Sequence, residues 1–286
     1  MPSSKKSGFA VMVGRSNVGK STLLNHLIGT KIAITSPKPQ TTRKSIHGIL
    51  HDPRGQIVFV DTPGVFEKSH DKLTASLNRE AKSALAGVDV ILYVVDPTRE
   101  IGNEERIVQR LISSSSAPKI MVINKTDIKN PPFIERYKDE GRQFDAVLEI
   151  SALRGKNLAP LIDKIFETLP YGEPFYPEFQ FSNIPHNEWL AEHIREKIYI
   201  QTQKEIPYSA HVEIDEITER GSGIVYIKAR ILTTSSQYKK MIIGAKGRKI
   251  KEIGTAARKE LEQILDKKVY LELEVEVDPG WMERIH

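Results

Sequence analysis

The sequence of 286 residues contains no cysteine and no long apolar run. The lack of cysteine excludes a disulfide framework, a thiolate zinc site, an iron–sulfur cluster and a cysteine nucleophile, and it favours a reducing compartment. The longest purely apolar stretch, Val90–Val95, has six residues, whereas a membrane-spanning helix needs about 20. No apolar segment follows the polar N-terminal residues, as an export signal would require. We therefore expect a cytoplasmic protein without a membrane span.

The charge balance is mild, but positive charge is unevenly distributed. The chain has 42 Lys and Arg against 37 Asp and Glu, a net charge of +5, which does not by itself indicate an anionic partner. Hydrophobic residues at 39% and charged residues at 28% are ordinary for a folded protein and argue against a disordered chain or a coiled coil. Between Gln237 and Lys251 there is no acidic residue, and six residues are basic: Lys239, Lys240, Lys246, Arg248, Lys249 and Lys251. This stretch is a candidate anion-binding surface.

Short β-branched runs alternate with helical patterns from Phe9 to about Leu169. This alternation, with strands apolar on both faces, predicts an α/β domain with a mostly parallel sheet covered by helices. Residues 45–50 add a predicted antiparallel strand. The other expected strands are Phe9–Val13, Ile57–Val60, Val90–Val95, Ile120–Ile123 and Val147–Ile150, and helices are expected to begin near Lys20, Leu73, Asn103, Phe133 and Leu158.

A proline-rich stretch predicts a domain boundary. Three prolines fall within the eight residues Pro170–Pro177, which favours a stiff linker. We therefore expect a first domain over residues 1–170, a linker over 171–186 and a smaller α+β domain over 187–286. In that domain the patterns predict a helix at Glu188–Gln203, strands at Ala210–Thr218 and Ile224–Leu232, helical segments at Tyr238–Ile243 and Arg248–Leu265, and a strand at Val269–Val277.

The segment Gly14–Ser21 fits Gly-x-x-x-x-Gly-Lys-[Ser/Thr] between a predicted strand and a predicted helix. In such a loop Gly14 and Gly19 let backbone amides surround a phosphate, and the helix N-terminus adds partial positive charge. Lys20 reaches the terminal phosphates and Ser21 offers its hydroxyl to magnesium. The predicted nucleotide-binding segment also includes Asn17, Val18 and Thr22.

Asp61-Thr62-Pro63-Gly64 follows a predicted strand, at the sheet edge where parallel α/β folds bind ligands. Asp61 can orient a magnesium-bound water. The Gly64 amide can donate to a terminal phosphate, so this loop can sense whether that phosphate is present.

Two further motifs that follow strands favour guanine as the base. Asn124-Lys125-Thr126-Asp127 closes one strand and Ser151-Ala152-Leu153 closes another. The Asp127 carboxylate can accept from the ring N–H and the exocyclic amine of guanine, a donor pair that adenine lacks, so a kinase or general ATPase is disfavoured. Asn124 is expected to brace the loops, Lys125 to cover the base, and the Ala152 amide to donate to the guanine carbonyl oxygen.

Together with Pro39-Gln40-Thr41-Thr42-Arg43, these motifs resemble the five signatures of Ras-like G domains, and this segment is similar to the first switch of the Era GTPases. The resemblance implies that Thr42, with Thr41 as the alternative, completes a magnesium shell formed with Ser21 and Asp61. Lys20, Thr42 and Gly64 are then the expected catalytic residues. Val65 and Phe66 follow Gly64, so the usual water-orienting glutamine is missing and slow GTP hydrolysis is expected. Asn17 is either a potassium-binding residue, as in related GTPases, or a turn residue.

The second domain contains Gly-x-x-Gly between two helical segments. Paired glycines permit close approach of a sugar–phosphate backbone, and KH domains clamp single-stranded nucleic acid on such a loop. The element order resembles a type II KH domain. The candidate RNA-binding residues are Ile243, Gly244, Ala245, Lys246, Gly247, Arg248 and Lys249, and the alternative is a solvated basic helix face.

A G domain followed by a KH domain resembles the Era GTPase family over nearly the whole chain. The resemblance implies GTP, GDP and Mg²⁺ as ligands, with K⁺ as a further candidate. It also implies binding to the 3′ end of 16S ribosomal RNA during assembly of the small ribosomal subunit, and peripheral contact with the inner membrane. A monomer suffices. Two alternatives stay open: a constitutive RNA-binding module whose nucleotide only stabilises it, and a related GTPase acting on the large subunit or on transfer RNA.

Overall fold

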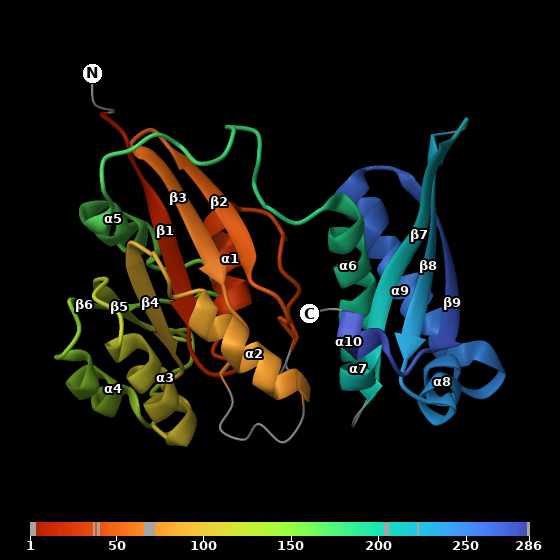
Figure 1. Ribbon diagram of the computed structural model, residues 1–286, viewed down its shortest axis with the longest axis horizontal. Coiled ribbons are helices and arrows are strands. Elements are labelled where there is room, and N and C mark those ends of the chain that lie inside the picture. Colours follow the sequence, from red (N-terminus) through yellow and green to blue (C-terminus); the bar gives the residue numbers. More distant parts are fainter. Residues whose placement is uncertain are drawn as a thin grey trace. The chain divides into compact units, whose positions relative to one another are not determined.

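The computed structural model describes residues 4–36, 38, 41–65, 72–202, 206–221 and 223–284 (Figure 1). The chain forms two compact units. The first comprises Met1–Thr35 and Thr42–Asn183, and the second comprises Ser36–Thr41 and Ile184–His286.

The first unit contains a six-stranded sheet in the order β2-β3-β1-β4-β5-β6 (Figure 1). Its strands are β1 (Lys6–Val13), β2 (Ile46–Asp52), β3 (Gly55–Asp61), β4 (Val90–Val95), β5 (Lys119–Ile123) and β6 (Ala146–Glu149). Only the β2–β3 pair is antiparallel among the described strands of this sheet. The predicted mostly parallel α/β sheet with one antiparallel strand is therefore confirmed.

Burial of the strands follows their position in the sheet. Every residue of the central strand β4 is buried, as its uninterrupted apolar run predicts. In β6, burial alternates and Val147 is 38% exposed. The expectation that this strand is apolar on both faces is wrong, because β6 lies at the edge of the sheet.

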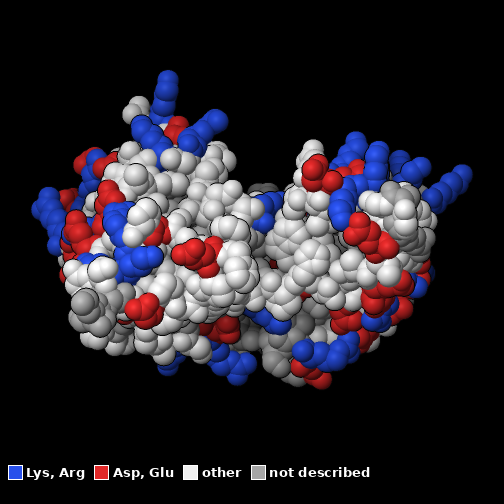
Figure 2. Space-filling view, turned by 90° about the horizontal axis from the view of Figure 1, so that it is seen from above, with Lys and Arg blue, Asp and Glu red and all other residues white. Residues whose placement is uncertain are grey.

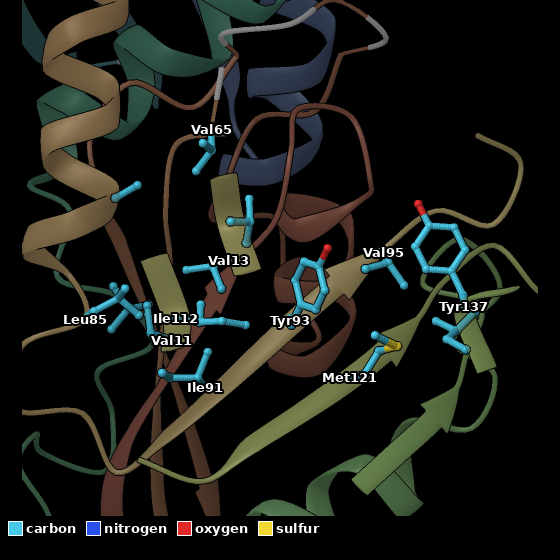
Figure 3. Packing of buried hydrophobic residues seen from close by; sticks show 14 of the residues in the cluster. Val11, Val13, Val65, Leu85, Ile91, Tyr93, Val95, Ile112, Met121 and Tyr137 are labelled. Atoms are coloured by element: carbon cyan, nitrogen blue, oxygen red, sulfur yellow. The ribbon is translucent and has the colours of Figure 1, made fainter. Parts of the chain in front are cut away.

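Five helices are described in the first unit: α1 (Lys20–Ile28), α2 (Lys72–Ser83), α3 (Asn103–Ser113), α4 (Ile134–Gly141) and α5 (Leu158–Thr168). Helices α2, α3 and α4 contribute Ala81, Val108 and Tyr137 to one core cluster. Figure 3 labels Tyr137 among the members of this cluster. Alternate residues of the central strands complete it, including Tyr93 and Met121. Helix α1 packs against β2 and β3.

Residues 171–183, most of the predicted linker, belong to the first unit. Gln56 is 1% exposed, and its Oε1 accepts from the amides of Phe175 at 2.8 Å and Tyr176 at 3.0 Å. Further along, the Ile49 amide donates to the Phe181 carbonyl at 3.0 Å. The proline-rich stretch therefore runs along β2 and β3.

The second unit has a three-stranded sheet in the order β7-β8-β9. Strand β8 (Ile224–Thr233) pairs antiparallel with β7 (Ala210–Arg220) and parallel with β9 (Lys268–Val277). Its helical elements are α6 (His186–Gln201), α7 (Ile206–Ser209), α8 (Ser236–Ile243), the 3₁₀ turn η1 (Ala245–Gly247), α9 (Arg248–Leu265) and α10 (Trp281–Arg284). The predicted small α+β domain of KH type is confirmed by this arrangement.

One apolar core holds the second unit together. It joins residues of α6, α8 and α9 with the inward-facing residues of the sheet, among them Ile194, Ile227 and Leu261. Ser235 caps α8, with its hydroxyl accepting from the Tyr238 amide at 3.3 Å. Within the part of the chain that the structure describes, no helix is long and apolar enough to cross a membrane.

Candidate nucleotide site and nucleic-acid loop

The carboxyl ends of the parallel strands place the sequence motifs along one edge of the first sheet. Strand β1 leads into the phosphate loop, β3 ends at Asp61, β5 at Ile123 before Asn124, and β6 precedes Ser151. Since these strands are parallel to one another, all four motifs lie at the edge that binds ligands in such sheets.

Lys20 lies inside the phosphate loop. It is 6% exposed, and its amine donates to the carbonyls of Gly14 and Arg15, both at 3.1 Å. Burial lowers the pKa of Lys20 to about 8, against the opposing charge of Asp61. A phosphate that enters the loop provides the negative charge that a buried ammonium group otherwise lacks.

Three oxygen-bearing side chains meet beside Lys20. The Ser21 hydroxyl donates to Asp61 Oδ2 at 2.6 Å, and the Thr42 hydroxyl lies 2.9 Å from that of Ser21 and 3.4 Å from Asp61 Oδ2. The other oxygen, Asp61 Oδ1, is buried with no hydrogen-bond partner among the described residues. Burial raises the pKa of Asp61, while Lys20 and the two hydroxyls act in the opposite direction. Two hydroxyls and a carboxylate with an unpaired oxygen fit Mg²⁺, which prefers oxygen ligands and phosphate.

The two candidate threonines behave differently. The Thr42 hydroxyl is in this cluster, whereas the Thr41 hydroxyl donates to the Lys38 carbonyl at 2.7 Å. The geometry therefore favours Thr42 as the magnesium ligand. Pro39 and Gln40 of the same motif lie outside the described residues.

The segment that precedes Thr42 belongs to the second unit. There Arg195, which is 1% exposed, donates from Nη2 to the Thr41 carbonyl at 2.6 Å. The Lys38 amine donates to the carbonyls of Tyr199 and Thr202. Sequence patterns gave no sign of the role of Arg195, because the contact spans 154 positions.

The Gly64 loop lies directly against the phosphate loop. A Cβ on Gly64 would come within 2.7 Å of the Ser16 Cα, so a side chain has no room there. The next residue, Val65, donates its amide to the Gly14 carbonyl at 3.3 Å. Phe66 lies outside the described residues.

The two guanine motifs are joined by a buried asparagine. Asn124 is 2% exposed, donates to the Val18 carbonyl at 2.8 Å and accepts from the Ala152 amide at 2.8 Å. The Ala152 amide that we expect to meet guanine is therefore already used by Asn124. The Asp127 side chain is held by the Ser151 hydroxyl, which donates to Oδ1 at 2.5 Å.

Around this cluster, the remaining predicted nucleotide residues differ in exposure. Asp127 and Leu153 are exposed, Lys125 is partly exposed, and Thr22 is half-buried at the start of α1. An exposed Asp127 is open to contact with a base. Asn17 is also exposed and has a φ of 62°, a backbone conformation that asparagine tolerates better than most residues. The turn interpretation of Asn17 thus has a structural reason of its own.

Asp96 was missed by the sequence analysis. It follows β4, is fully buried, and accepts from the Lys125 amine at 2.6 Å. Burial alone would raise its pKa, but hydrogen bonds from Lys125 and Thr98 hold the pKa of Asp96 below its usual value. The sequence signal that could have indicated Asp96 is its position, as an acidic residue directly after the strand β4.

In the second unit, the Gly-x-x-Gly loop joins α8 to α9 through η1. Gly244 has φ 73° and ψ 174°, a conformation essentially reserved for glycine. Ala245, Lys246 and Arg248 are exposed, while Ile243, Gly247 and Lys249 are partly buried. The loop thus combines glycine backbone with the exposed basic side chains of Lys246 and Arg248.

The basic stretch is partly neutralised by a residue just beyond it. Glu252 accepts from Lys249 at 2.7 Å and lies 3.9 Å from Arg248, while Arg248 stays 81% exposed. On the face seen in Figure 2, Lys and Arg side chains gather along the rim of the second unit, next to Asp and Glu side chains. Lys246 and Arg248 are therefore the basic groups of the loop best placed to meet phosphates.

The outer face of the second sheet has a different charge pattern. Lys228 and Arg230 of β8 are ion-paired with Glu274 at 3.0 Å and Asp215 at 2.9 Å. Arg230 also pairs with Glu213 and Glu276. Acidic groups surround the basic ones on this face, so it is less suited than the loop to a polyanion.

Comparison with known proteins gives matches for both units. Residues 9–125 match the family model of a 50S ribosome-binding GTPase, and residues 205–282 match that of a KH domain. The chain is 44% identical to the GTPase Era of Halothermothrix orenii, over 98% of this chain and 96% of the relative. It is 42% identical to the GTPase Era of Aquifex aeolicus, over 98% and 96%.

Solved structures of two proteins are similar over the same length. One is Era in complex with MgGDPNP and nucleotides 1506–1542 of 16S ribosomal RNA, with 41% identity and a TM-score of 0.91. The other is an Era variant from Aquifex aeolicus bound to GDP·AlF4⁻, with 42% identity and a TM-score of 0.90. Each covers 98% of this chain and 96% of the other.

Proposed function

Because this chain belongs to the Era GTPase family, we propose that it is a GTP-switched protein that binds the 3′ end of 16S ribosomal RNA and acts in assembly of the small ribosomal subunit. The proposal assigns GTP binding to residues 1–170, the connection to 171–186 and RNA binding to 187–286. A monomer in the cytoplasm, with peripheral contact to the inner membrane, is part of the same proposal and is supported by the family resemblance alone.

One observation supports a switch more than any other. The Thr42 hydroxyl lies 2.9 Å from the Ser21 hydroxyl and 3.4 Å from Asp61 Oδ2. The preceding residue, Thr41, belongs to the second unit, and its carbonyl accepts a hydrogen bond from Arg195. A ligand that orders Thr42 therefore acts on a segment that the RNA-binding unit also holds. A switch requires such an element, whose state both sites influence.

Hydrolysis would use groups already gathered at the phosphate edge. Lys20 and the loop amides would place positive charge around the transferring phosphoryl group. Gly64 lies against the phosphate loop, where its amide would donate to that group. Ser21, Thr42 and Asp61 would hold Mg²⁺, which neutralises phosphate charge when bound. No glutamine follows Gly64, since Val65 stands there, so we expect slow intrinsic hydrolysis that RNA stimulates.

Potassium is a separate part of the proposal. A K⁺ ion held by Asn17 would add positive charge where other GTPases use an arginine. The test compares GTP hydrolysis in potassium and sodium chloride at equal concentration, for the natural protein and for Asn17→Gly. A potassium stimulation lost in the variant supports the site, and equal rates in both salts leave Asn17 as a turn residue.

The RNA-binding switch is tested by direct binding measurements. The full chain, loaded with GDP or with GDPNP, is titrated with a single-stranded RNA matching nucleotides 1506–1542 of 16S ribosomal RNA. We expect tighter binding with GDPNP and loss of binding in a Gly244→Asp, Gly247→Asp variant. Gly223→Asp is the matched control, because Gly223 also has a positive φ in the second unit and has open space around it.

The outcomes separate the alternatives. Equal affinity in both nucleotide states would favour a constitutive RNA-binding module. A preference for large-subunit or transfer RNA over the 16S segment would favour the related assembly GTPases, one of which the family-model description names.

A further inference from the structure

Arg15 stands in the phosphate loop, but its side chain is buried inside the first unit. The residue is 5% exposed, and its Nε lies 2.5 Å from Oε1 of Glu105, which is 2% exposed. Nη1 donates to the Glu100 carbonyl at 3.2 Å. The other oxygen of Glu105 accepts from the Gly102 amide at 3.0 Å, directly before α3. The guanidinium thus ties the phosphate loop to the beginning of α3.

The backbone of the same residue contacts two catalytic elements. Its carbonyl accepts from the Lys20 amine at 3.1 Å, and Arg15 forms an isolated parallel bridge with Val65. Val65 follows Gly64, whose Cα lies so close to Ser16 that a Cβ would approach it within 2.7 Å. Displacement of Arg15 would therefore move both Lys20 and the Gly64 loop.

A contribution to stability alone does not explain the buried Arg15–Glu105 ion pair. Arg15 Nη2 and the hydroxyls of Tyr93 and Tyr137 are buried with no hydrogen-bond partner among the described residues. Both tyrosines belong to the core cluster in Figure 3. Burial, followed by the charge of Glu105, raises the pKa of each. Buried ion pairs with unsatisfied neighbours are often no more stable than apolar replacements, so a geometric role accounts better for a charged pair here.

We infer that Arg15 and Glu105 are positioning residues that hold the phosphate loop against the Gly64 loop, and thereby set the affinity for GTP relative to that for GDP. This inference rests on the proposed GTPase function. Both nucleotides use the phosphate loop, but only GTP has the terminal phosphate that the Gly64 amide can meet. Loosening the contact between the two loops should therefore weaken GTP binding more than GDP binding.

The test measures the dissociation constants of GDP and GDPNP for the full chain and for Glu105→Gln and Arg15→Lys. Glu105→Gln keeps the shape but removes the charge, and Arg15→Lys keeps the charge but removes the planar fork. Arg136→Met is the control, because Arg136 forms an exposed pair with the Glu100 side chain at 2.9 Å. Thermal unfolding shows which variants are folded. If Arg15→Lys does not fold, the near-isosteric Glu105→Gln still tests the inference.

We expect the ratio of the GDPNP to the GDP dissociation constant to rise by about fivefold or more in both variants and to stay unchanged in the control. A merely structural role would weaken both nucleotides equally, so an unchanged ratio in the folded variants would overturn the inference. A natural protein that binds neither nucleotide would instead overturn the proposed function.

Discussion

The nucleotide edge of the first unit and the Gly244–Gly247 loop of the second differ in the burial and hydrogen bonding of their polar side chains. At the nucleotide edge, Lys20, Asp61 and Asn124 are buried and hydrogen-bonded to other polar groups. At the loop, Lys246 and Arg248 are exposed, and the ion pairs made nearby join residues three or four positions apart.

This difference teaches how each site recognises its ligand. Buried and preorganised polar groups gain strength from low dielectric surroundings and reject a ligand that leaves them unpaired. Exposed charges bind a polyanion through counterion release and discriminate weakly between sequences. Substitutions at the first site should therefore have large, specific effects, and removal of a single charged side chain at the second should have a small effect that depends on salt.

The comparison is tested most severely at Asp127. Asp127→Ala removes the acceptor for the guanine donor pair, and we expect the preference for GTP over ATP to fall by about 10⁴. Competition binding with both nucleotides measures this preference. Asp139→Ala, which removes an exposed carboxylate paired with Arg142 at 2.9 Å, should leave it unchanged. Retention of the GTP preference in Asp127→Ala would place base recognition elsewhere.

A second large effect is expected at Lys20. Lys20→Met removes the amine that faces the terminal phosphates, and the rate constant of GTP hydrolysis should fall by about 10²–10³. Single-turnover hydrolysis separates this loss from weaker binding. Lys164→Met is the control, since Lys164 is paired with Glu167 on the surface. A normal rate in Lys20→Met would contradict the proposed site.

Asn124 tests whether the buried brace stabilises the fold. Asn124→Ala leaves the Val18 carbonyl and the Ala152 amide without their side-chain partner, so the free energy of unfolding should fall by about 1–3 kcal/mol. Urea unfolding without nucleotide measures it. Asn187→Ala, at an exposed position of α6, should have little effect, and equal values for both variants would show that the brace does not stabilise.

The smallest effect is expected at Arg248. In a plot of log affinity for single-stranded RNA against log salt concentration, Arg248→Ala should reduce the slope by about 0.7, the value for one lost phosphate contact. Lys228→Ala, on the acidic sheet face, should leave the slope unchanged. If Lys228→Ala reduced the slope as much as Arg248→Ala, RNA binding would be assigned to the sheet face rather than to the loop.

Most of the fold was predictable because its signals are local. The uninterrupted apolar run of β4 and the motifs that follow the parallel strands indicated the sheet and its ligand-binding edge. Ser235 before α8 and Gly244 after it mark that helix by ordinary capping rules. The helix predicted at 188–203 begins two positions earlier, at His186, and residue 203 lies outside the described residues.

The remaining features depend on distant residues. The partners of Arg15 are 85 and 90 positions away, and Arg195 reaches Thr41 across 154 positions. The Ala152 amide is taken by Asn124 across 28 positions. Periodicity and short motifs do not contain such information, since it arises only when the strands are assembled into the sheet.

The attachment of residues 175–182 to the first unit has a consequence for the solubility of that unit. Strand β2 is one of the two outer strands of the sheet, and Ser182 forms an antiparallel bridge with Gly48 on its free side. Unpaired edge strands invite pairing with other chains. A fragment that ends at Pro170 would uncover this edge together with the buried amide of Gln56, so it should self-associate, whereas one that extends to Asn183 keeps the edge covered.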